Sequence, residues 1–382
     1  MRHKNSVYHA LLQHVPWGGF DELVDEHGGD KGVRTLTMRS QFSAMLYGQL
    51  AGAVSLRDIE GGLQSHRARL YHANAKPVKR STLADANASR PAAVYTGLFL
   101  KLMRQAHRGL RRSLEETVYL IDSTSLRLNE LSKEWARFSS GVCGTKAHVI
   151  YDADAACPVY MAVTAANVND ITAAQAMPIE AGASYVFDLG YYDYGWWAKL
   201  DAAGCRIVTR FKSNTALRTI EDRPVAKDDA ILSDRVGYLP ARQAKNRKNP
   251  YRDPVREVRV KIETGKILRI LSNDLDASAK DIAGLYKHRW QIELFFRWVK
   301  QNLKIKKFLG VSENAIRIQI AIALIAYLLL RLAHASQKSN LTLLEFTRLV
   351  RSNLMHLKRI DRLLGDDIET PSDNRQMALQ CL

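Results

Sequence analysis

Cysteine is scarce in this chain. Only four cysteines occur in 382 residues, and no two of them have the C-x-x-C spacing, or a related one, of a metal site. This argues against a zinc centre and against a disulfide-rich secreted scaffold. We expect reduced cysteines that serve mostly as packing residues in a cytosolic protein, namely Cys143, Cys157, Cys205 and Cys381.

Long apolar runs are also missing. The longest stretch, Ile320–Leu330, is bracketed by Arg317, Gln319 and Arg331 and is too short to cross a bilayer, so we interpret it as a buried helix. The first twenty residues lack the apolar segment of a signal peptide. The sequence therefore predicts a cytoplasmic protein that makes no use of a membrane.

Acidic residues are few relative to basic ones. The chain has 39 Asp and Glu against 56 Lys and Arg, which gives a formal net charge of +17. Such an excess favours a polyanionic partner, either nucleic acid or an anionic membrane surface. The lack of a spanning segment makes the membrane the weaker of these two interpretations. The length allows two or three domains, and the 46% apolar content is ordinary for a globular protein.

The first 112 residues predict a helical domain. Ser55 is a candidate N-cap, with Asp58 three residues on, and Ser81 and Ser89 are candidate N-caps of two further helices. Two short helices with a tight, basic junction fit either a helix-turn-helix or a plain helical packing domain, and the sequence leaves both open. Helical spacing is clearest for Gln41, Phe42, Met45, Leu46, Leu50 and Ala53.

From Thr117 onward the pattern becomes α/β. A hairpin that feeds parallel crossovers predicts a mixed α/β sheet. The expected order is a strand at Val118–Asp122, a polar loop at Ser123–Ser125, a hairpin of Lys146–Ala155 and Pro158–Ala166, a helix at Thr172–Met177, a strand before Asp188, a helix at Trp196–Ala202 and a strand at Cys205–Asn214.

Residues 215–275 interrupt this pattern. Alternating residues on both sides of a turn at Thr264 and Gly265 predict a β-hairpin. Eight basic and two acidic residues lie between Arg242 and Lys261, which fits a surface that follows phosphates or a solvated loop. We interpret the segment as a β-rich basic insertion. After Gly310 the chain is expected to be helical to about residue 364.

The run Leu285–Leu303 contains no Gly or Pro and predicts a helix. Tyr286, Arg289, Glu293 and Lys300 fall on one face of it and span about 21 Å. This face is either a functional surface or a solvated face with an i,i+4 pair of Arg289 and Glu293. The neighbouring apolar stripe contains Leu285, Ile292, Phe296, Val299 and Leu303.

Three carboxylates stand in informative places. Asp122 and Asp188 end predicted strands, where sites form in open α/β sheets, and Glu293 lies on the helix after the insertion. Three acids at one point would repel one another, and hard oxygen ligands suit Mg²⁺. Two such ions stabilise the attacking and leaving oxygens in phosphodiester chemistry, which agrees with the net charge.

These residues make the chain resemble DDE transposases of the insertion-sequence type, specifically the group with a Y-x2-R-x3-E-x6-K signature (the IS-four group). Tyr286, Arg289, Glu293 and Lys300 keep every spacing of that signature. LIDST, residues 120–124, resembles the family's first-Asp motif, and VFDLGYYDY, residues 186–194, resembles its second. The resemblance covers residues 115–310 well and the N-terminal domain only loosely.

The resemblance implies a ribonuclease-H-like α/β catalytic domain with a β-rich insertion, an N-terminal helical domain and C-terminal helices. The corresponding ranges are 1–112 for the helical domain with possible DNA-end binding, 113–214 and 276–310 for the catalytic domain, 215–275 for the insertion, and 311–382 for the C-terminal helices and tail.

The resemblance also implies roles for individual residues. Asp122, Asp188 and Glu293 would bind Mg²⁺, expected as two ions, with Mn²⁺ as a substitute. Double-stranded DNA, both transposon ends and target, would be the partner of a homodimer in the bacterial cytoplasm, associated with the nucleoid when bound. Residues expected to contact DNA are Tyr286, Arg289, Trp290, Lys300, Arg297, Lys304, Arg210 and Lys212, of which Trp290 would stack on a displaced base unless it is buried.

Two alternatives to an active transposase remain. One is a DNA-binding derivative without chemistry, and the other is a structure-selective nuclease that cuts without joining. Four further acids are expected to lie outside the metal site: Asp152 and Asp154 in the hairpin turn, Asp170 as a supporting residue or a loop cap, and Asp193 facing solvent.

Overall fold

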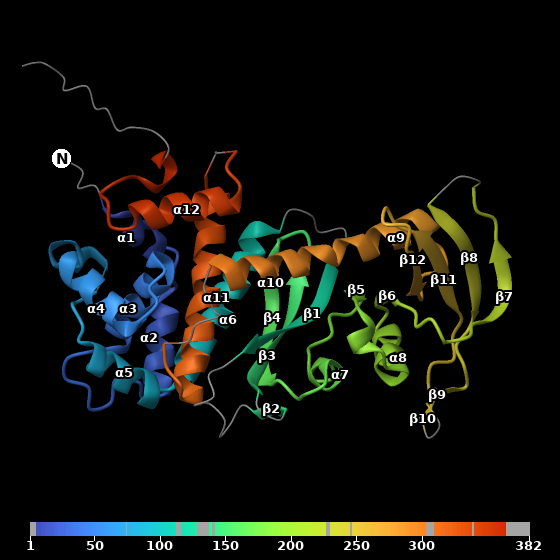
Figure 1. Cartoon of the computed structure of the whole chain (residues 1–382), viewed down its shortest axis with the longest axis horizontal. Coiled ribbons are helices and arrows are strands. Elements are labelled where there is room, and N and C mark those ends of the chain that lie inside the picture. The colour runs from blue at the N-terminus through green and yellow to red at the C-terminus, as the bar shows by residue number, and fades with distance from the viewer. Residues whose placement is uncertain are drawn as a thin grey trace, which may run out of the picture.

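Helices from both ends of the chain pack on one side of a large mixed sheet (Figure 1). The computed structural model describes residues 5–73, 75–111, 116–127, 137–139, 142–226, 230–244, 247–302, 309–337 and 340–363. The N-terminal helices are α1 (Val7–Leu12), α2 (Trp17–Glu26), α3 (Met38–Ala51), α4 (Leu56–Ser65), α5 (Arg80–Ser89) and α6 (Ala92–Leu110).

The predicted helix caps have mixed outcomes. Ser55 and Asp58 form a reciprocal capping box at the start of α4, as expected. The caps at Ser81 and Ser89 are wrong, because α5 already begins at Arg80 and ends at Ser89. Pro91 then occupies the N-cap position of α6 in an extended conformation, and its fixed φ suits the entry into a helix.

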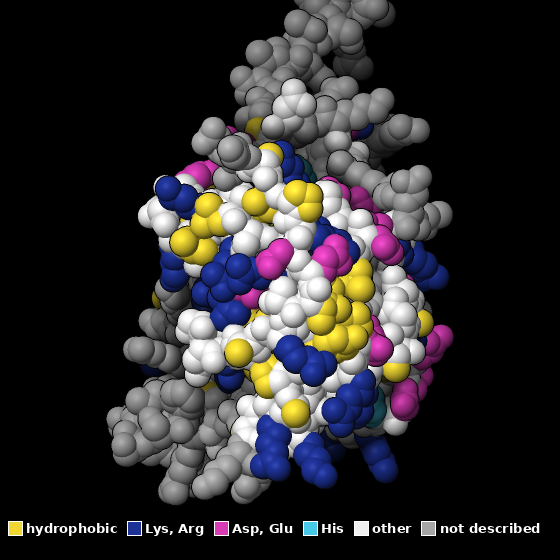
Figure 2. Space-filling view, turned by 90° about the vertical axis from the view of Figure 1, so that its right-hand side faces the viewer, with side chains coloured by type: hydrophobic (Ala, Val, Ile, Leu, Met, Phe, Trp, Pro, Cys, Tyr) yellow, Lys and Arg dark blue, Asp and Glu magenta, His cyan; other side chains and the backbone are white. Residues whose placement is uncertain are grey.

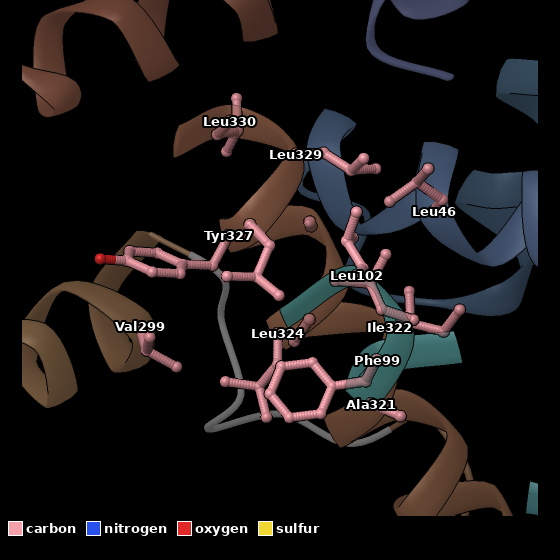
Figure 3. Packing of buried hydrophobic residues seen from close by; sticks show 14 of the residues in the cluster. Leu46, Phe99, Leu102, Val299, Ala321, Ile322, Leu324, Tyr327, Leu329 and Leu330 are labelled. Carbon is pink, nitrogen blue, oxygen red and sulfur yellow. The ribbon is translucent and has the colours of Figure 1, made fainter. Parts of the chain in front are cut away.

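The long C-terminal helix α11 (Glu313–Ala335) is the centre of the helical core. Its 23 residues are long and apolar enough to cross a membrane, but 83% of its most apolar window is buried inside the protein. Phe99 and Leu102 of α6 lie close to Leu324 and Ile322 of α11 in Figure 3. The prediction of a buried helix in this region is confirmed, and α12 (Leu343–Asn353) packs beside it.

Five strands form the part of the sheet that carries the acids. They are β1 (Val118–Arg127), β3 (Val142–Asp152), β4 (Cys157–Ala165), β5 (Ser184–Phe187) and β6 (Arg206–Arg210). Their spatial order is β4-β3-β1-β5-β6, with an antiparallel meander followed by two parallel strands. This order, with α7 (Asp170–Ala174) and α8 (Tyr194–Ala202) in the crossovers, is ribonuclease-H-like, and the fold class is confirmed.

Two predicted boundaries in this sheet are wrong. Ser123–Ser125 is not a loop, because β1 continues through it to Arg127 and pairs with β3 over that whole length. The last strand ends at Arg210 rather than at Asn214. There the guanidinium of Arg269 donates to the carbonyls of Lys212 (2.7 Å), Ser213 (2.9 Å) and Thr215 (3.0 Å), which holds these residues in a turn.

The insertion extends the same sheet. Its strands are β7 (Arg218–Arg223), β8 (Ile231–Tyr238), β11 (Val255–Lys261) and β12 (Ile267–Ser272), and β12 pairs antiparallel with β6. The predicted hairpin is β11–β12, with Gly265 in the left-handed region at its turn. The short strands β9 (Arg242–Ala244) and β10 (Arg247–Lys248) form a separate two-stranded sheet. Strand β2 (Arg137–Ser139) pairs with β3 and lies below it in Figure 1.

Helices α9 (Ala279–His288) and α10 (Trp290–Asn302) run across the sheet in succession (Figure 1). They correspond to the single helix predicted from Leu285, which begins six residues earlier and is interrupted at Arg289. The predicted apolar stripe packs on the core through Ile292, Phe296 and Val299. Its last member, Leu303, lies outside the described residues.

Candidate active site

Asp122 and Asp188 lie side by side where the parallel pairing of β1 and β5 ends. Asp188 directly follows β5, but the prediction that Asp122 ends its strand is wrong, because β1 continues to Arg127. Ile121 of β1 is paired with Phe187 of β5, and each acid follows directly. Adjacent strands lie about 4.8 Å apart, so Asp122 and Asp188, which follow this pair, are also neighbours across the two strands. Leu120 and Val186 belong to the core under α9, α10 and α11, and the two-residue alternation of a strand places both acids on that face.

Each of these carboxylates is oriented by a backbone amide. The amide of Ser123 donates to Asp122 Oδ1 over 2.7 Å, and the amide of Gly190 donates to Asp188 Oδ1 over 2.8 Å. Both acids are only partly exposed. Their carboxylate groups are therefore held in defined directions without being closed off from a ligand.

Arg210 extends the row of Asp122 and Asp188 onto a third strand. Thr209 of β6 is paired with Phe187, so Arg210 follows on the third parallel strand, beside Asp188. Its Nε is buried and has no hydrogen-bond partner within the described part of the chain. A buried donor without a partner is costly, which makes Arg210 a stronger DNA-contact candidate than its position on a buried strand indicated.

Glu293 reaches the same place from α10, and Arg289 lies between the acids. Arg289 Nη2 lies 2.5 Å from Glu293 Oε1, and Nη1 lies 4.0 Å from Asp122 Oδ2. The guanidinium also lies 5.7 Å from the ring centre of Tyr286, which is buried. The three acids thus converge, but a cation of the protein itself separates Glu293 from Asp122.

The electrostatics of Asp122 reflect this crowding. Burial raises its pKa to about 7, the Ser123 amide opposes that rise, and Asp188 adds to it. Arg289 lowers the pKa and Glu293 raises it. A divalent cation beside Asp122 would reverse the cost of ionising it.

The fit to a metal ion is partial in this arrangement. Within the described ranges, no three Asp, Glu, His or Cys side chains are close enough together to enclose an ion. The two aspartates present adjacent hard oxygen donors, whereas Glu293 is engaged by Arg289. The donor set suits Mg²⁺ once Glu293 exchanges its arginine partner for the ion.

A polar cluster on the opposite face of the sheet was missed as part of the site. The Ser123 hydroxyl donates to Asp170 Oδ1 over 2.7 Å, and Lys146 Nζ lies 3.1 Å from the same oxygen. His148 is fully buried with Nδ1 3.6 Å from Asp170, and burial lowers its pKa to about 4. The buried Tyr191 has its pKa raised well above the usual value by burial, and then by Asp122, Asp170 and Asp188. No motif spacing connects these residues; only the strand register brings them together.

The remaining acids set aside in the sequence analysis are structural. Asp152 accepts from the backbone amides of Asp154 and Ala155, which fits the predicted turn, and it also pairs with His107 of α6. The expectation that Asp193 faces solvent is wrong. It is buried because it caps α8 through the Trp196 amide, and it pairs with Arg247 at 2.9 Å.

The other predicted DNA contacts have different surroundings. Trp290 is 49% exposed, so the alternative that it is a buried packing residue is wrong. The guanidinium of Arg297 lies 5.3 Å from the centre of its ring. Lys212 is exposed with Nζ 4.3 Å over the Tyr192 ring, and Lys300 is partly buried on α10. Lys304 lies outside the described residues.

The surface at the insertion end combines basic and apolar groups. Figure 2 views this end and shows Lys and Arg side chains around an apolar patch. Exposed apolar side chains of the insertion include Ile220, Leu232 and Ile267.

The fold and the paired aspartates on adjacent parallel strands indicate the class of the protein. Residues 113–329 match the family described as the Transposase DDE domain, and residues 3–76 match a domain of unknown function (DUF4372). The first match covers more than half of the chain. The chain therefore belongs to the DDE transposase family.

Individual relatives agree with this assignment. The chain is 41% identical over 297 residues to a putative transposase, y4zB, of Sinorhizobium fredii, covering 77% of this chain and 82% of that protein. It is 28% identical over 282 residues to a probable transposase for insertion sequence element IS5377 of Geobacillus stearothermophilus, covering 71% and 72% of the two chains. Similarity to a piggyBac transposase synaptic complex has a TM-score of 0.45 at 9% identity, with 91% and 84% coverage, and is too weak to carry an argument.

Proposed function

We propose that this transposase binds the inverted-repeat ends of its insertion sequence, cleaves DNA there by metal-dependent hydrolysis and joins the freed 3′-hydroxyls to target DNA. The observation that carries the proposal is the placement of Asp122 beside Asp188 on adjacent parallel strands, with Glu293 joined to Asp122 through Arg289. Two Mg²⁺ ions, replaceable by Mn²⁺, would supply activation of water and stabilisation of charge on the scissile phosphate. The expected setting is the bacterial cytoplasm, with the nucleoid as the location of the DNA-bound form.

The residues around the acids have two proposed roles, metal binding and phosphate binding. Asp122 and Asp188 would hold the ions, with Glu293 completing the set after it releases Arg289. Arg289 is then available to a phosphate of the DNA, together with Arg210 and Lys300. Tyr286 supports Arg289 through its ring, so we place it behind the phosphate contact rather than on the DNA itself.

The exposed side of α10 is the proposed track for the transposon end. Trp290 and Arg297 share this side, and the cation–π contact holds the indole in place for stacking on a displaced base. Lys212, and Lys304 farther along the chain, would extend the track. Because two transposon ends must be held together, we expect a homodimer in the DNA complex.

A groove in the N-terminal helices is the proposed second DNA contact. Its volume is about 870 Å³, and it contains Arg39, Arg67 and Lys76 beside Tyr71, which is 68% exposed. None of the described residues that line it is acidic. Replacing Arg67 and Lys76 by Ala should weaken end binding. It should also make the slope of log binding constant against log salt concentration shallower, by the contribution of about two phosphate contacts. The control changes Lys31 and Arg34, which are exposed in the loop between α2 and α3 and do not line the groove.

The direct test of the proposed function is cleavage of a duplex that carries the inverted repeat flanking the coding region. The protein should nick it in Mg²⁺ and not in EDTA, and a pre-cleaved end should be joined to a target plasmid. Glu293→Gln should retain end binding and lose cleavage. Glu313→Gln is the control: it removes the i,i+4 ion-pair partner of Arg317 on α11 and should leave cleavage unchanged. Nicking by Glu293→Gln in Mg²⁺ would contradict the assignment.

A further inference from the structure

We propose that Asp170 is a positioning residue that fixes the directions of both catalytic aspartates from the opposite face of the sheet. This inference rests on the proposed function, because it concerns how the metal site is held. Asp170 begins α7, 48 residues after Asp122 and 18 before Asp188 in the chain. The strand register and the crossover through α7 bring Asp170 close to both Asp122 and Asp188, on the other face of the sheet.

The link to Asp122 passes through Ser123. Successive residues of a strand point to opposite faces, so the Ser123 side chain points away from the acids. Its hydroxyl donates to Asp170 Oδ1 over 2.7 Å, while its backbone amide donates to Asp122 Oδ1 over 2.7 Å. Fixing the hydroxyl therefore fixes the amide that orients the first carboxylate.

The link to Asp188 passes through Gly190. The Gly190 amide donates to Asp188 Oδ1 over 2.8 Å. A methyl group added at Gly190 would lie 3.0 Å from both Asp170 Oδ2 and Asp188 Oδ1. The second oxygen of Asp170 therefore lies close to Gly190, the residue whose amide orients the second carboxylate.

The surroundings of Asp170 favour a fixed supporting group rather than another metal ligand. Oδ1 already receives the Ser123 hydroxyl and lies 3.1 Å from Lys146 Nζ. Lys146 is itself anchored by donating to the Val168 carbonyl over 3.0 Å. Groups that orient metal ligands in this way are worth about tenfold to a hundredfold in metal affinity or activity.

Binding of Mn²⁺ alone, followed by electron paramagnetic resonance on the intact protein, tests the inference. Asp170→Ala and Ser123→Ala should each weaken Mn²⁺ binding by about tenfold or more. The double variant should be no weaker than the worse single variant, because both act through one hydrogen bond. Ser125→Ala, two residues along β1 with an exposed side chain, should bind as the parent does.

The outcomes separate the inference from the proposed function. If the parent binds Mn²⁺ and Asp122→Asn abolishes this binding, the metal site stands, and unchanged binding in Ser123→Ala and Asp170→Ala would overturn the inference alone. If Asp122→Asn binds as the parent does, the proposed metal site and the inference both fail. If Asp170→Ala does not fold, Ser123→Ala decides, because it removes a single hydroxyl.

Discussion

Arg289 Nη2 lies 2.5 Å from Glu293 Oε1, one helical turn away, at the junction where α9 ends and α10 begins. The same guanidinium lies 4.0 Å from Asp122, so it occupies the space between two acids of the candidate site. A cation of the chain thus stands where the proposed mechanism needs a divalent ion. Metal binding and release of Arg289 are expected to be coupled.

Replacing Arg289 by Ala should make the metal-free protein less stable and more responsive to metal. Both acids lose their partner, which costs about 1–3 kcal/mol for such partly buried groups. Added Mg²⁺ should then raise the melting temperature more than in the parent, because the ion no longer competes with the guanidinium. Differential scanning calorimetry with and without Mg²⁺ measures both effects.

Arg317→Ala is the matched control for that experiment. Arg317 forms an exposed i,i+4 pair with Glu313 on α11, so its loss should change stability by at most about 0.5 kcal/mol and leave the Mg²⁺ response unchanged. An equal Mg²⁺ response in the parent and in Arg289→Ala would show that arginine and metal do not compete.

Gly190→Ala should impair cleavage more than folding. The added methyl group would press on Asp170 and Asp188 at 3.0 Å, and the carboxylates must move by a few tenths of an ångström to accept it. We expect a loss of about tenfold or more in the cleavage rate with little change in the urea midpoint. Gly284→Ala, in α9 with no atom near the new methyl group, should keep full activity and gain slightly in stability.

Acid should destabilise the protein through His148. Burial lowers its folded-state pKa to about 4, below the unfolded value of 6.5, so the unfolded chain binds the extra proton. This contribution to stability is present above pH 6.5 and is lost as the pH falls to 4, up to about 3 kcal/mol. His148→Gln should flatten this part of the pH dependence in urea unfolding. Parallel curves for the two proteins would contradict the prediction.

Trp290→Ala should weaken binding of a transposon end. Base stacking on an aromatic ring contributes about 1–3 kcal/mol, so the dissociation constant should rise roughly 5-fold to 150-fold in a gel-shift titration. Trp290→Phe should recover part of this loss. Leu294→Ala is the control because Leu294 is also exposed on α10, at 43%, without a stacking ring. A similar loss for both Ala variants would indicate a general apolar contact.

Local patterns predicted much of this molecule because they depend on near neighbours in the chain. The capping box at Ser55 and the hairpin turn at Asp152 are such features. Asp122 and Asp188 were singled out because an acid after a short apolar run is visible in the sequence, and the strand register places the two side by side. The ribonuclease-H-like order followed from the resemblance and agrees with the observed register.

What the sequence could not show depends on long-range pairing. The polar residues at Ser123–Ser125 read as a loop, but pairing with β3 outweighs their weak strand preference. Asp170 was judged a minor residue because its partners come from β1, from β3 and from the turn after β5. The continuation of the sheet into the insertion depends on β6 meeting β12, which no local pattern encodes.

The most direct test of the whole account is the position of Mn²⁺ in crystals of the protein with a transposon end. Anomalous scattering should place an ion within roughly 2–2.5 Å of carboxylate oxygens of Asp122 and Asp188, with Glu293 turned toward it and Arg289 moved to a phosphate. An empty site with Arg289 still bound to Glu293, or ions held elsewhere at the scissile phosphate, would contradict it.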